Sequence, residues 1–310
     1  MKCVITGANG FLGQVLAKNM LEKGHSVLGL VRREEAKKII TGLGAEVEQA
    51  DLFDKAKLGE ILKNYKPDTI FHLAAEIATQ RNKNLIYQVN VEGTKLLAQA
   101  CRGVNISSFV YASSVVIGNP KGELIDENSN LTATTTYGKS KQEAEKLLLN
   151  EMKQHNLPVV ILRPSHVYGY GGWYKELVGE MLKGRFMIPG NGNNWWDVVH
   201  VDDVADAFAL AAEKVVKGEI FHIVDDQPVL MKDFFATTAK SLNLKKPWHI
   251  PTFIASLVKG SEPIAAAVRS AKSSNKKLKL LGWQPKYPSC ELGIAHCIAK
   301  LNNITYVSKT

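Results

Sequence analysis

A tyrosine and a lysine four residues apart could carry out acid–base chemistry in this chain. Tyr137 and Lys141 lie in the segment YGKSK, at the start of a helical pattern over 137–154, so their side chains face the same side of a helix. A free tyrosine has a pKa of about 10, too high for an effective base near neutral pH, but a nearby lysine ammonium lowers it. Tyr137 could then give a proton to a carbonyl oxygen or take one from an alcohol. The spacing is common, and an exposed pair without chemistry is the alternative.

Three glycines near the start of the chain could hold a phosphate group. Gly7, Gly10 and Gly13 follow the apolar run 2–6 and lead into a helical pattern over 11–22. Glycines between a strand and a helix let the backbone approach a pyrophosphate, and the helix N-terminus stabilises its charge. Tight turns and close packing also favour glycine. The position of this turn, at the opening of an alternating strand–helix pattern, is the context that a dinucleotide site requires.

These residues need a scaffold to position them, and the chain has the pattern of one. Short, near-continuously apolar runs predict strands covered on both faces, and the stretches between them predict helices. The predicted strands are 2–6, 25–31, 45–50, 68–74, 107–114, 157–163 and 219–224, and the longest predicted helices are 84–101 and 137–154. This alternation predicts an α/β fold with a doubly wound parallel sheet of the Rossmann type.

The rhythm changes after the segment that ends at 165. Loop-forming segments follow at 169–173 and 189–196, and the pattern is mostly helical from 225 onward. We expect a dinucleotide-binding Rossmann domain formed by residues 1–165 and about 196–224. A smaller, mostly helical C-terminal substrate subdomain would be formed by about 166–195 and 225–310.

The composition is that of a globular protein and excludes several classes. The chain has 310 residues, of which 45% are hydrophobic and 22% charged, and no apolar stretch is long enough to cross a bilayer. Met1 and Lys2 lead directly into the first apolar run, so we expect no secretory signal. The net charge of +9 comes with no recognition motif, so we expect neither a nucleic acid nor a membrane as partner, although a basic site for anionic ligands stays open. The cysteines have no zinc spacing, which predicts reduced, buried thiols in a cytoplasmic protein without a metal site; they are Cys3, Cys101, Cys290 and Cys297.

Several segments together resemble the motifs of a known family. The glycine spacing G-x-x-G-x-x-G in TGANGFLG is similar to that of the extended short-chain dehydrogenase/reductase superfamily, whose members are NAD-dependent epimerase/dehydratase-like. Further similar segments follow in the order of that family: DL at 51–52, HLAA at 72–75, NVEGT at 90–94, YGKSK at 137–141, RPSHVYG at 163–169 and VHVDDVA at 199–205. The resemblance covers most of the chain. It implies a nicotinamide cofactor and a two-fold homodimer formed through the helices 84–101 and 137–154.

The resemblance also implies the site residues. The expected catalytic residues are Ser113, Tyr137 and Lys141, and the lysine is expected to hold the nicotinamide ribose as well. Ser113 is counted back four residues from Ile117, which stands where the family has a tyrosine, and Ser114 is the alternate. The expected cofactor-binding residues are Gly7, Asn9, Gly10, Phe11, Leu12, Gly13, Arg32, Arg33, Asp51, Leu52, Leu73, Ala74, Ala75, Asn90, Tyr137, Lys141, Pro164 and His166. The histidines His72, His166 and His200 are interpreted as structural or adjacent to the cofactor.

The end of the second predicted strand distinguishes the two nicotinamide cofactors. An NAD site usually has Asp or Glu there, which accepts hydrogen bonds from the ribose 2′-hydroxyl. This chain has Arg32 and Arg33 instead, and a guanidinium matches a 2′-phosphate. Glu34 or Glu35 could still reach a ribose, and two surface charges at a helix start are the remaining alternative. We therefore expect NADP as cofactor, with NAD possible.

Two departures from the family patterns bear on the substrate. Dehydratases have an Asp-Glu pair directly after the catalytic Ser or Thr, where this chain has Ser114 and Val115 instead. Epimerases commonly have an arginine where this chain has Trp196, which can stack on a ring but cannot grip a diphosphate, although Lys183 and Arg185 could replace that arginine.

The most similar patterns are then those of dihydroflavonol reductases and hydroxysteroid dehydrogenases. We expect an NAD(P)-dependent oxidoreductase that transfers hydride between its cofactor and a carbonyl or secondary alcohol of a small molecule, by a Ser–Tyr–Lys mechanism. One alternative is an NAD-dependent nucleotide-sugar epimerase that uses the same three residues. The other is a dinucleotide-sensing protein without catalysis.

Overall fold

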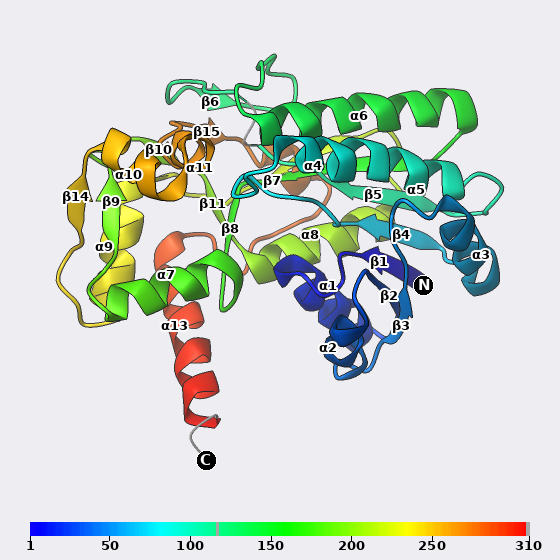
Figure 1. The fold of residues 1–310 in the computed structure, drawn as a ribbon, viewed down its shortest axis with the longest axis horizontal. Coiled ribbons are helices and arrows are strands. Elements are labelled where there is room, and N and C mark those ends of the chain that lie inside the picture. Colours follow the sequence, from blue (N-terminus) through cyan, green and yellow to red (C-terminus); the bar gives the residue numbers. More distant parts are fainter. Residues whose placement is uncertain (116–117, 308–310) are drawn as a thin grey trace.

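A seven-stranded parallel sheet forms the centre of the larger part of the molecule (Figure 1). The computed structural model describes residues 1–115 and 118–307. The strand order is β12-β7-β5-β4-β1-β2-β3, which confirms the predicted doubly wound sheet. Its strands are β1 (Lys2–Thr6), β2 (Ser26–Val31), β3 (Glu46–Gln49), β4 (Thr69–His72), β5 (Ser108–Ala112), β7 (Val159–Pro164) and β12 (Ile220–Ile223).

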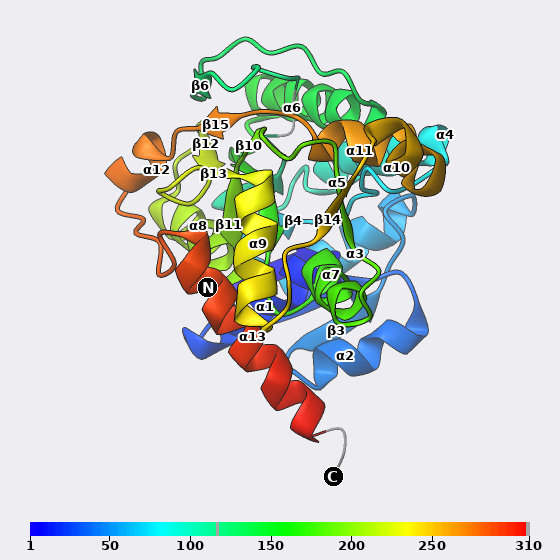
Figure 2. The same ribbon diagram turned by 90° about the vertical axis from the view of Figure 1, so that its left-hand side faces the viewer.

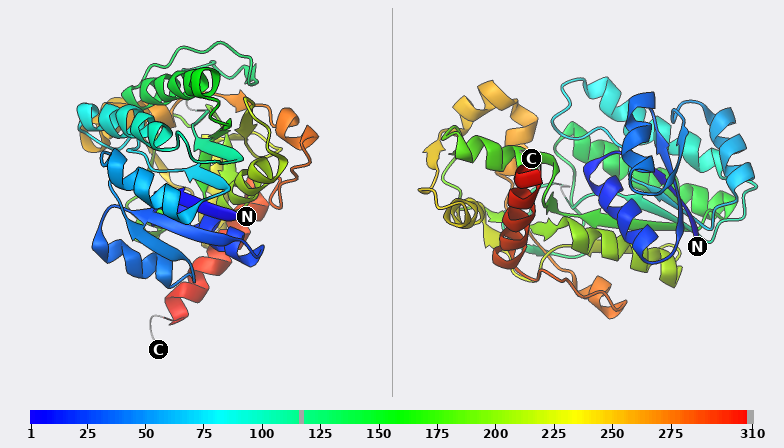
Figure 3. Two further views of the ribbon diagram at one scale, coloured as in Figure 1. Left: turned by 90° about the vertical axis from the view of Figure 1, so that its right-hand side faces the viewer. Right: turned by 90° about the horizontal axis from the view of Figure 1, so that it is seen from below.

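Both faces of the sheet are covered by helices (Figure 3), because successive strand residues point to opposite sides. In β1, Cys3 and Ile5 belong to one hydrophobic core and Val4 belongs to the other. The first core includes residues of α1 (Phe11–Glu22), α2 (Lys37–Thr41), α8 (Val201–Lys214) and α12 (Lys276–Leu280). The second includes residues of α3 (Lys55–Tyr65), α5 (Thr94–Ala100) and α6 (Thr136–His155). This double burial explains why the strands have apolar runs rather than alternation.

The first of the two long predicted helices contains a π-helical turn. It consists of α4 (Lys83–Tyr87), the π-helical turn η2 (Gln88–Gly93) and α5, and it lies beside α6 as expected. The turn contains Asn90, whose side chain donates to the Glu76 carbonyl at 2.9 Å and to Ser140 Oγ at 3.0 Å. The Asn90 side-chain oxygen also accepts the Glu76 N–H at 2.8 Å. These bonds hold the π-helical turn between the end of β4 and α6.

The smaller part of the molecule lies beyond the carboxyl ends of the sheet strands (Figures 1 and 2). Its core is rich in aromatic side chains: Tyr168, Tyr174, Trp196, Phe234 and Phe235 are all buried there. Its helices are α7 (Gly172–Leu182), the 11-residue α9 (Met231–Ser241), α10 (Thr252–Lys259), α11 (Ser261–Ala267) and α13 (Cys290–Val307).

Short paired strands join these helices to each other and to the larger part. They are β8 (His166–Tyr168) with β11 (Val198–His200), β9 (Met187–Pro189) with β14 (Trp248–Ile250), β10 (Trp195–Trp196) with β13 (Val229–Leu230), and β6 (Leu124–Ile125) with β15 (Lys272–Ser273). The sequence predicts a mostly helical subdomain and misses these short strands, because runs of two or three residues have no readable periodicity.

Segments of the two parts alternate along the chain. The helix α8 packs on α1, and β12 closes the edge of the sheet. Leu278 and Trp283, which the sequence places in the substrate subdomain, are buried in the core of the larger part.

The four cysteines are all buried and free of disulfides, as predicted. Among the helices that the structure describes, none has both the length and the apolar character that crossing a bilayer requires.

Candidate active site

A cavity of about 400 Å³ lies at the carboxyl ends of β1, β2 and β4. After β3, at one edge of the sheet, the chain passes to β4 on the other side of β1, so the strand order changes direction between β1 and β4. Ligands of doubly wound sheets bind at such a point. Many predicted cofactor-binding residues form its walls: Gly7, Asn9, Gly10, Arg32, Arg33, Asp51, Leu52, Leu73, Ala74 and Ala75. Sequence reasoning missed the other wall residues: Thr6, Leu30, Ala50, Phe53, Leu58, Glu76 and Val89. Only Phe53 had a readable signal, as an aromatic residue directly after the DL pair.

The glycine turn leaves room for a phosphate. Gly7 has a φ of +67°, and a Cβ there would lie 2.9 Å from the backbone of Ala74. Gly10 precedes α1 and no side chain caps that helix, so the N–H groups of its first turn stay available to an anion. A Cβ on Gly13 would lie 2.8 Å from the Cα of Ala8, so this glycine allows the helix to approach the strand. The turn therefore fits a pyrophosphate.

Two arginines form the wall of the cavity at the end of β2. Arg32 and Arg33 are both exposed and both line the cavity. Glu34 instead pairs with Lys37 at 2.9 Å, and neither Glu34 nor Glu35 is among the residues found in the cavity wall. The charge that this end of the cavity offers a ligand is therefore positive.

Tyr137 and Lys141 lie together at the start of α6, next to the carboxyl end of β5. Thr135 caps this helix. Tyr137 and Lys141 are four residues apart within it, so their side chains lie one turn apart. The Tyr137 hydroxyl shares a hydrogen bond with Ser114. The Lys141 Nζ donates to the Ala112 carbonyl at 2.8 Å and lies 5.9 Å from the centre of the Tyr137 ring.

Burial controls the protonation of this pair. It raises the pKa of Tyr137 to about 12, against the opposing effect of the hydrogen bond with Ser114. It lowers the pKa of the Lys141 ammonium to about 7, while the nearby Glu145 carboxylate raises that pKa. From the sequence we expect Lys141 to lower the pKa of Tyr137, whereas in the structure burial raises that pKa and only the hydrogen bond with Ser114 opposes it. Tyr137 is a neutral phenol at pH 7 and can donate a proton.

The two serines that follow β5 have different partners. The Ser113 hydroxyl donates to the carboxylate of Glu145, which is buried and pairs with Arg163 at 2.6 Å. Ser114 is the serine beside Tyr137. The structure thus places the alternate serine, one position later than expected, next to the phenol. Neighbouring side chains of an extended segment point to opposite sides, so an offset of one exchanges their surroundings. Ile117, from which the expected register is counted, lies outside the described residues.

Phe11 connects the glycine turn to the smaller subdomain. A Cβ on Gly169, Gly171 or Gly172 would lie within 2.8–2.9 Å of its ring. The glycines of the segment GYGGW therefore make space for this ring. Phe11 and the next residue, Leu12, lie outside the cavity wall.

The expected histidines are held by contacts within the protein. The ring nitrogens of His72 lie 2.8 Å from the hydroxyls of Thr6 and Thr94, and burial lowers the His72 pKa to about 3. His166 stacks on Trp196 at 4.6 Å between ring centres, and burial lowers the His166 pKa to about 4. Neither His166 nor the nearby Pro164 lines the cavity.

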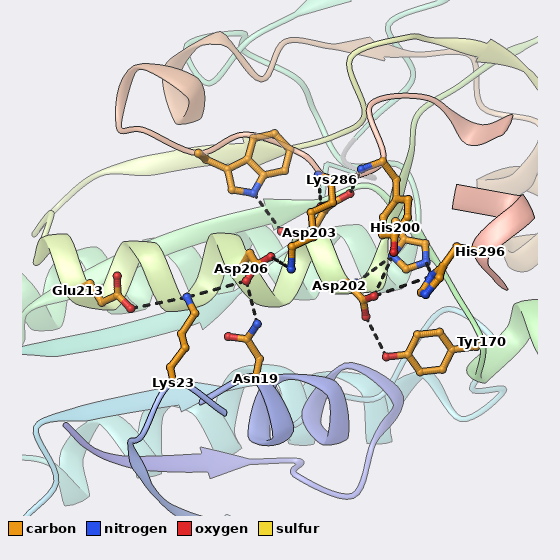
Figure 4. A network of polar contacts seen from close by, with 12 residues as sticks. Asn19, Lys23, Tyr170, His200, Asp202, Asp203, Asp206, Glu213, Lys286 and His296 are labelled. Carbon is orange, nitrogen blue, oxygen red and sulfur yellow. Dashed lines mark hydrogen bonds and ion pairs between the residues drawn. The ribbon is translucent and has the colours of Figure 1, made fainter. Parts of the chain in front are cut away.

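The starts of α8 and α13 bring His200, Asp202 and His296 together (Figure 4), although the sequence predicts no metal site. Their potential ligand atoms lie within 4.8 Å of one another. The His200 Nδ1 accepts the Asp202 N–H at 3.2 Å, so the neutral ring has its proton on Nε2. That nitrogen faces the His296 Nδ1 at 3.3 Å, and Tyr170 donates to Asp202 at 2.9 Å. The group is satisfied as a chain of hydrogen bonds, which leaves His200 no lone pair for a metal.

The remaining acids of the VHVDDVA region hold α8 in place (Figure 4). Asp203 accepts the backbone N–H groups of Lys286 at 2.6 Å and Tyr287 at 3.0 Å. Asp206 pairs with Lys286 at 2.7 Å and accepts from Asn19 of α1 at 2.8 Å. These acids join three segments of the fold and take no part in the candidate site.

Comparisons with known sequences agree with this geometry. The family model described as the NAD dependent epimerase/dehydratase family matches residues 3–224. UDP-glucose 4-epimerase from Mycolicibacterium smegmatis is 29% identical, over 98% of this chain and 99% of its own length. The 4-hydroxy-2-methyl-3-oxo-4-farnesyl-3,4-dihydroquinoline-1-oxide ketoreductase from Stigmatella aurantiaca is 26% identical, over 95% of this chain and 86% of its own.

Solved structures have the same fold. UDP-glucose 4-epimerase from Thermotoga maritima, solved with UDP-glucose, has a TM-score of 0.85 at 24% identity, over 99% of this chain and 100% of its own. The human epimerase family protein SDR39U1, solved with NADPH, has a TM-score of 0.83 at 17% identity, over 97% of this chain and 100% of its own. At these identities the likeness shows the fold alone.

Proposed function

The chain belongs to the NAD dependent epimerase/dehydratase family, and we propose that it is an oxidoreductase of the extended short-chain type that uses NADP(H). The family membership read from the motifs is confirmed by the match over residues 3–224. The proposed reaction is hydride transfer between the nicotinamide and a carbonyl or secondary alcohol of a small molecule. The observation that carries this proposal is the group of Ser114, Tyr137 and Lys141 at the carboxyl end of β5.

The cavity residues would hold the dinucleotide in an extended form. The turn from Gly7 to Gly10 would hold the pyrophosphate, and Asp51, Leu52 and Phe53 would surround the adenine. Arg32 and Arg33 support NADP over NAD, because both residues line the end of the cavity where a 2′-phosphate would lie. The bound nicotinamide supplies or accepts the hydride.

The chain itself supplies the proton. The neutral Tyr137 hydroxyl donates its proton to the substrate oxygen during reduction and takes it back during oxidation. The charged form of Lys141 stabilises the phenolate that remains after the transfer. Ser114 takes the role expected for Ser113, since its hydroxyl is the one beside Tyr137 and can orient the same substrate oxygen.

A nucleotide-sugar epimerase is the second candidate. It would use the same three residues, and the likeness to an epimerase over nearly the whole chain favours it. The surroundings of Trp196 weigh against it: this residue is 4% exposed and packs among His166, Phe234 and Phe235. Trp196 itself therefore offers no cation to a substrate phosphate.

The remaining parts of the proposal concern assembly and location. Residues 1–165 and about 196–224 would form the dinucleotide domain, and about 166–195 and 225–310 would form the substrate subdomain, apart from Leu278 and Trp283, which pack in the core of the larger part. Two copies pair through the helices at 84–101 and 137–154, which lie side by side on one face of the sheet. Four buried, unpaired cysteines support a reducing, cytoplasmic location.

One screen tests the proposal. NADPH oxidation is measured against a panel of aldehydes and ketones, and NADP⁺ reduction against secondary alcohols, beside epimerisation of UDP- and GDP-sugars with bound NAD. The proposal expects hydride transfer with a carbonyl or alcohol from the panel. Epimerisation without net NADPH consumption would establish the second candidate instead, and tight dinucleotide binding without turnover on any panel would favour the sensor.

A further inference from the structure

Large apolar side chains are exposed in β14 and α10. These two elements lie at the left-hand edge of Figure 1 and face the viewer in Figure 2. Trp248 in β14 and Leu257 in α10 are each 83% exposed, Phe253 is 68% exposed and Val258 is 64% exposed. In α10, Phe253 and Leu257 lie one turn apart, as do Ile254 and Val258, so they form one face of the helix. Single exposed apolar residues are ordinary, but several large ones in one short segment are typical of a surface that binds another molecule.

The same segment has only positive charge. Asp233 and Glu262 are separated by a stretch without acidic residues, which contains the exposed lysines Lys240, Lys245, Lys246 and Lys259. Two of them, Lys245 and Lys246, directly precede β14, and Lys259 ends α10. Exposed lysines before β14 and at the end of α10 thus flank the apolar side chains along the chain, and apolar side chains combined with basic ones are typical of surfaces that bind anionic membranes.

We propose that this surface, formed by Trp248, Phe253, Leu257 and Val258 with the flanking lysines, docks on an anionic phospholipid bilayer. The α10 helix would lie in the plane of the interface, with its apolar side chains among the acyl chains and the lysines at the headgroup phosphates. Tryptophan is the residue that membrane interfaces favour, which fits the high exposure of Trp248.

A second copy of this chain fits the surface less well. A two-fold interface places the same patch on both subunits, so the lysines around this patch would face each other and repel. A lipid surface has the opposite charge and an apolar interior, which match both features of the patch. The net charge of +9 adds a long-range attraction to the same surface.

The docking surface is tied to the catalytic helix. The Glu262 carboxylate, at the start of α11, accepts the hydroxyl of Thr136 at 2.6 Å and its N–H at 3.2 Å. Glu262 also pairs with Lys83 at 3.4 Å. Thr136 begins α6 and directly precedes Tyr137, so docking through α10 would fix the start of the catalytic helix relative to the bilayer.

The sequence alone predicts no membrane partner, and the fold explains why. The lysines are spread thinly along the whole chain, and α10 has only 8 residues, too few for a periodic signal. The apolar face becomes visible only when Ala255 is seen to be the buried residue of this helix.

Sedimentation with lipid vesicles tests the proposal on the full chain. Vesicles of phosphatidylcholine alone are compared with vesicles that contain phosphatidylserine. We expect binding to the anionic vesicles at least about tenfold stronger, and weaker binding at high salt. The double variant Phe253→Ser/Leu257→Ser, and separately Lys245→Glu/Lys246→Glu, should each lower that binding about tenfold or more.

Matched controls separate this surface from general effects. Leu280→Ser changes a leucine that is 90% exposed on α12, and Lys217→Glu changes an exposed lysine outside the segment; both should bind vesicles like the unaltered chain. Fluorescence quenching by brominated lipid should fall in Trp248→Phe. Absence of binding to anionic vesicles, or equal binding by the double variants and their controls, would overturn the proposal. So would a dimer in light scattering that Phe253→Ser/Leu257→Ser dissociates, because the patch would then be a contact between copies.

Discussion

The two ends of the candidate site, which are the cofactor cavity and the catalytic end around Tyr137, depend on different structural features. In the cofactor cavity the turn after β1 depends on backbone conformation, as at Gly7, where the positive φ demands glycine. The catalytic end depends on side chains that pair with each other, such as Ser113 with Glu145 and Ser114 with Tyr137. Residue identity is enough to predict a glycine turn. It is not enough to predict which of two adjacent serines faces a phenol, because that depends on the direction of each side chain.

The two ends also differ in whether their charged side chains are exposed or buried. At the cavity, Arg32 and Arg33 are exposed and available to a ligand. At the catalytic end, Lys141 is buried beside Glu145, whose charge is in turn balanced by Arg163. Substitutions in the cavity should therefore change affinity, whereas substitutions at the catalytic end should change turnover and its pH dependence.

The largest expected effect is that of Tyr137→Phe, which keeps the ring and removes the transferable proton. The turnover number should fall by about 10²–10⁴-fold, while the affinity for the cofactor stays nearly unchanged. Steady-state kinetics and cofactor titration measure the two quantities. The control Tyr65→Phe removes a buried hydroxyl on α3 and should leave both unchanged. If Tyr137→Phe has full activity, Tyr137 is not the proton donor, and the catalytic end would no longer differ from the cavity in its effect on turnover.

The next effect separates the two serines. Ser114→Ala should lower the turnover number by about 10²-fold, because the substrate oxygen loses its hydrogen-bond donor. Ser113→Ala should leave turnover within a few fold but cost about 1–3 kcal/mol of stability, since Glu145 loses a donor. Kinetics and denaturant unfolding of both variants decide the register. The reverse result would restore Ser113 as the catalytic serine.

A smaller effect is expected at the cavity. Arg32→Asp should weaken NADP(H) binding about ten- to a hundredfold, because a charge-assisted bond to the 2′-phosphate is lost, and it should favour NAD(H). The control Lys38→Asp makes the same change of charge on α2, outside the cavity wall. Calorimetric titration measures both cofactors. If the unaltered chain already binds NAD(H) more tightly, the assignment of Arg32 to a 2′-phosphate is wrong.

The smallest effect concerns pH. Glu145 raises the pKa of Lys141, so Glu145→Gln should move that pKa below about 7 and shift the alkaline fall of kcat/KM to lower pH. If the proton affinity of Lys141 becomes about tenfold weaker, its charged fraction at neutral pH falls about fivefold. The control Glu151→Gln breaks a similar pair on the same helix, with Arg102, and should lose stability without moving the pH profile. A profile that moves equally in both variants would assign Glu145 a purely structural role.

The sequence predicts the large elements well because both faces of the sheet are buried. The strand at Lys2–Thr6 and the helix at Phe11–Glu22 have the bounds that their apolar patterns indicate. The π-helical turn escapes the sequence because it depends on Asn90 and its partners Glu76 and Ser140, which are distant along the chain. The short strands cannot be predicted from the sequence, because two or three residues are too few to show a hydrophobic period.

The candidate site divides in the same way. The glycine turn and the Tyr137–Lys141 pair can be recognised from their residue types, their spacing and the order of the family motifs, whereas seven residues of the cavity wall were missed. The contact of Phe11 with the glycines of the smaller subdomain joins segments about 160 residues apart, which no local pattern shows. The meeting of His200 with His296 likewise depends on the packing of α8 against α13. Burial, which sets the protonation of Tyr137 and Lys141, is a property of the assembled fold.

The exchange of segments between the two parts of the molecule also affects how the chain folds during its synthesis. When the ribosome has made residues 1–164, β7 is complete, but α8, which packs on α1 and on β5 and β7, does not yet exist. The roughly 50 further residues up to Lys214 take about 3–10 s at about 5–20 residues per second. During those seconds one apolar face of the nascent sheet, including Leu16 and Met20 of α1, lacks its cover. We expect a fragment that ends at 165 to keep that face bare and to aggregate.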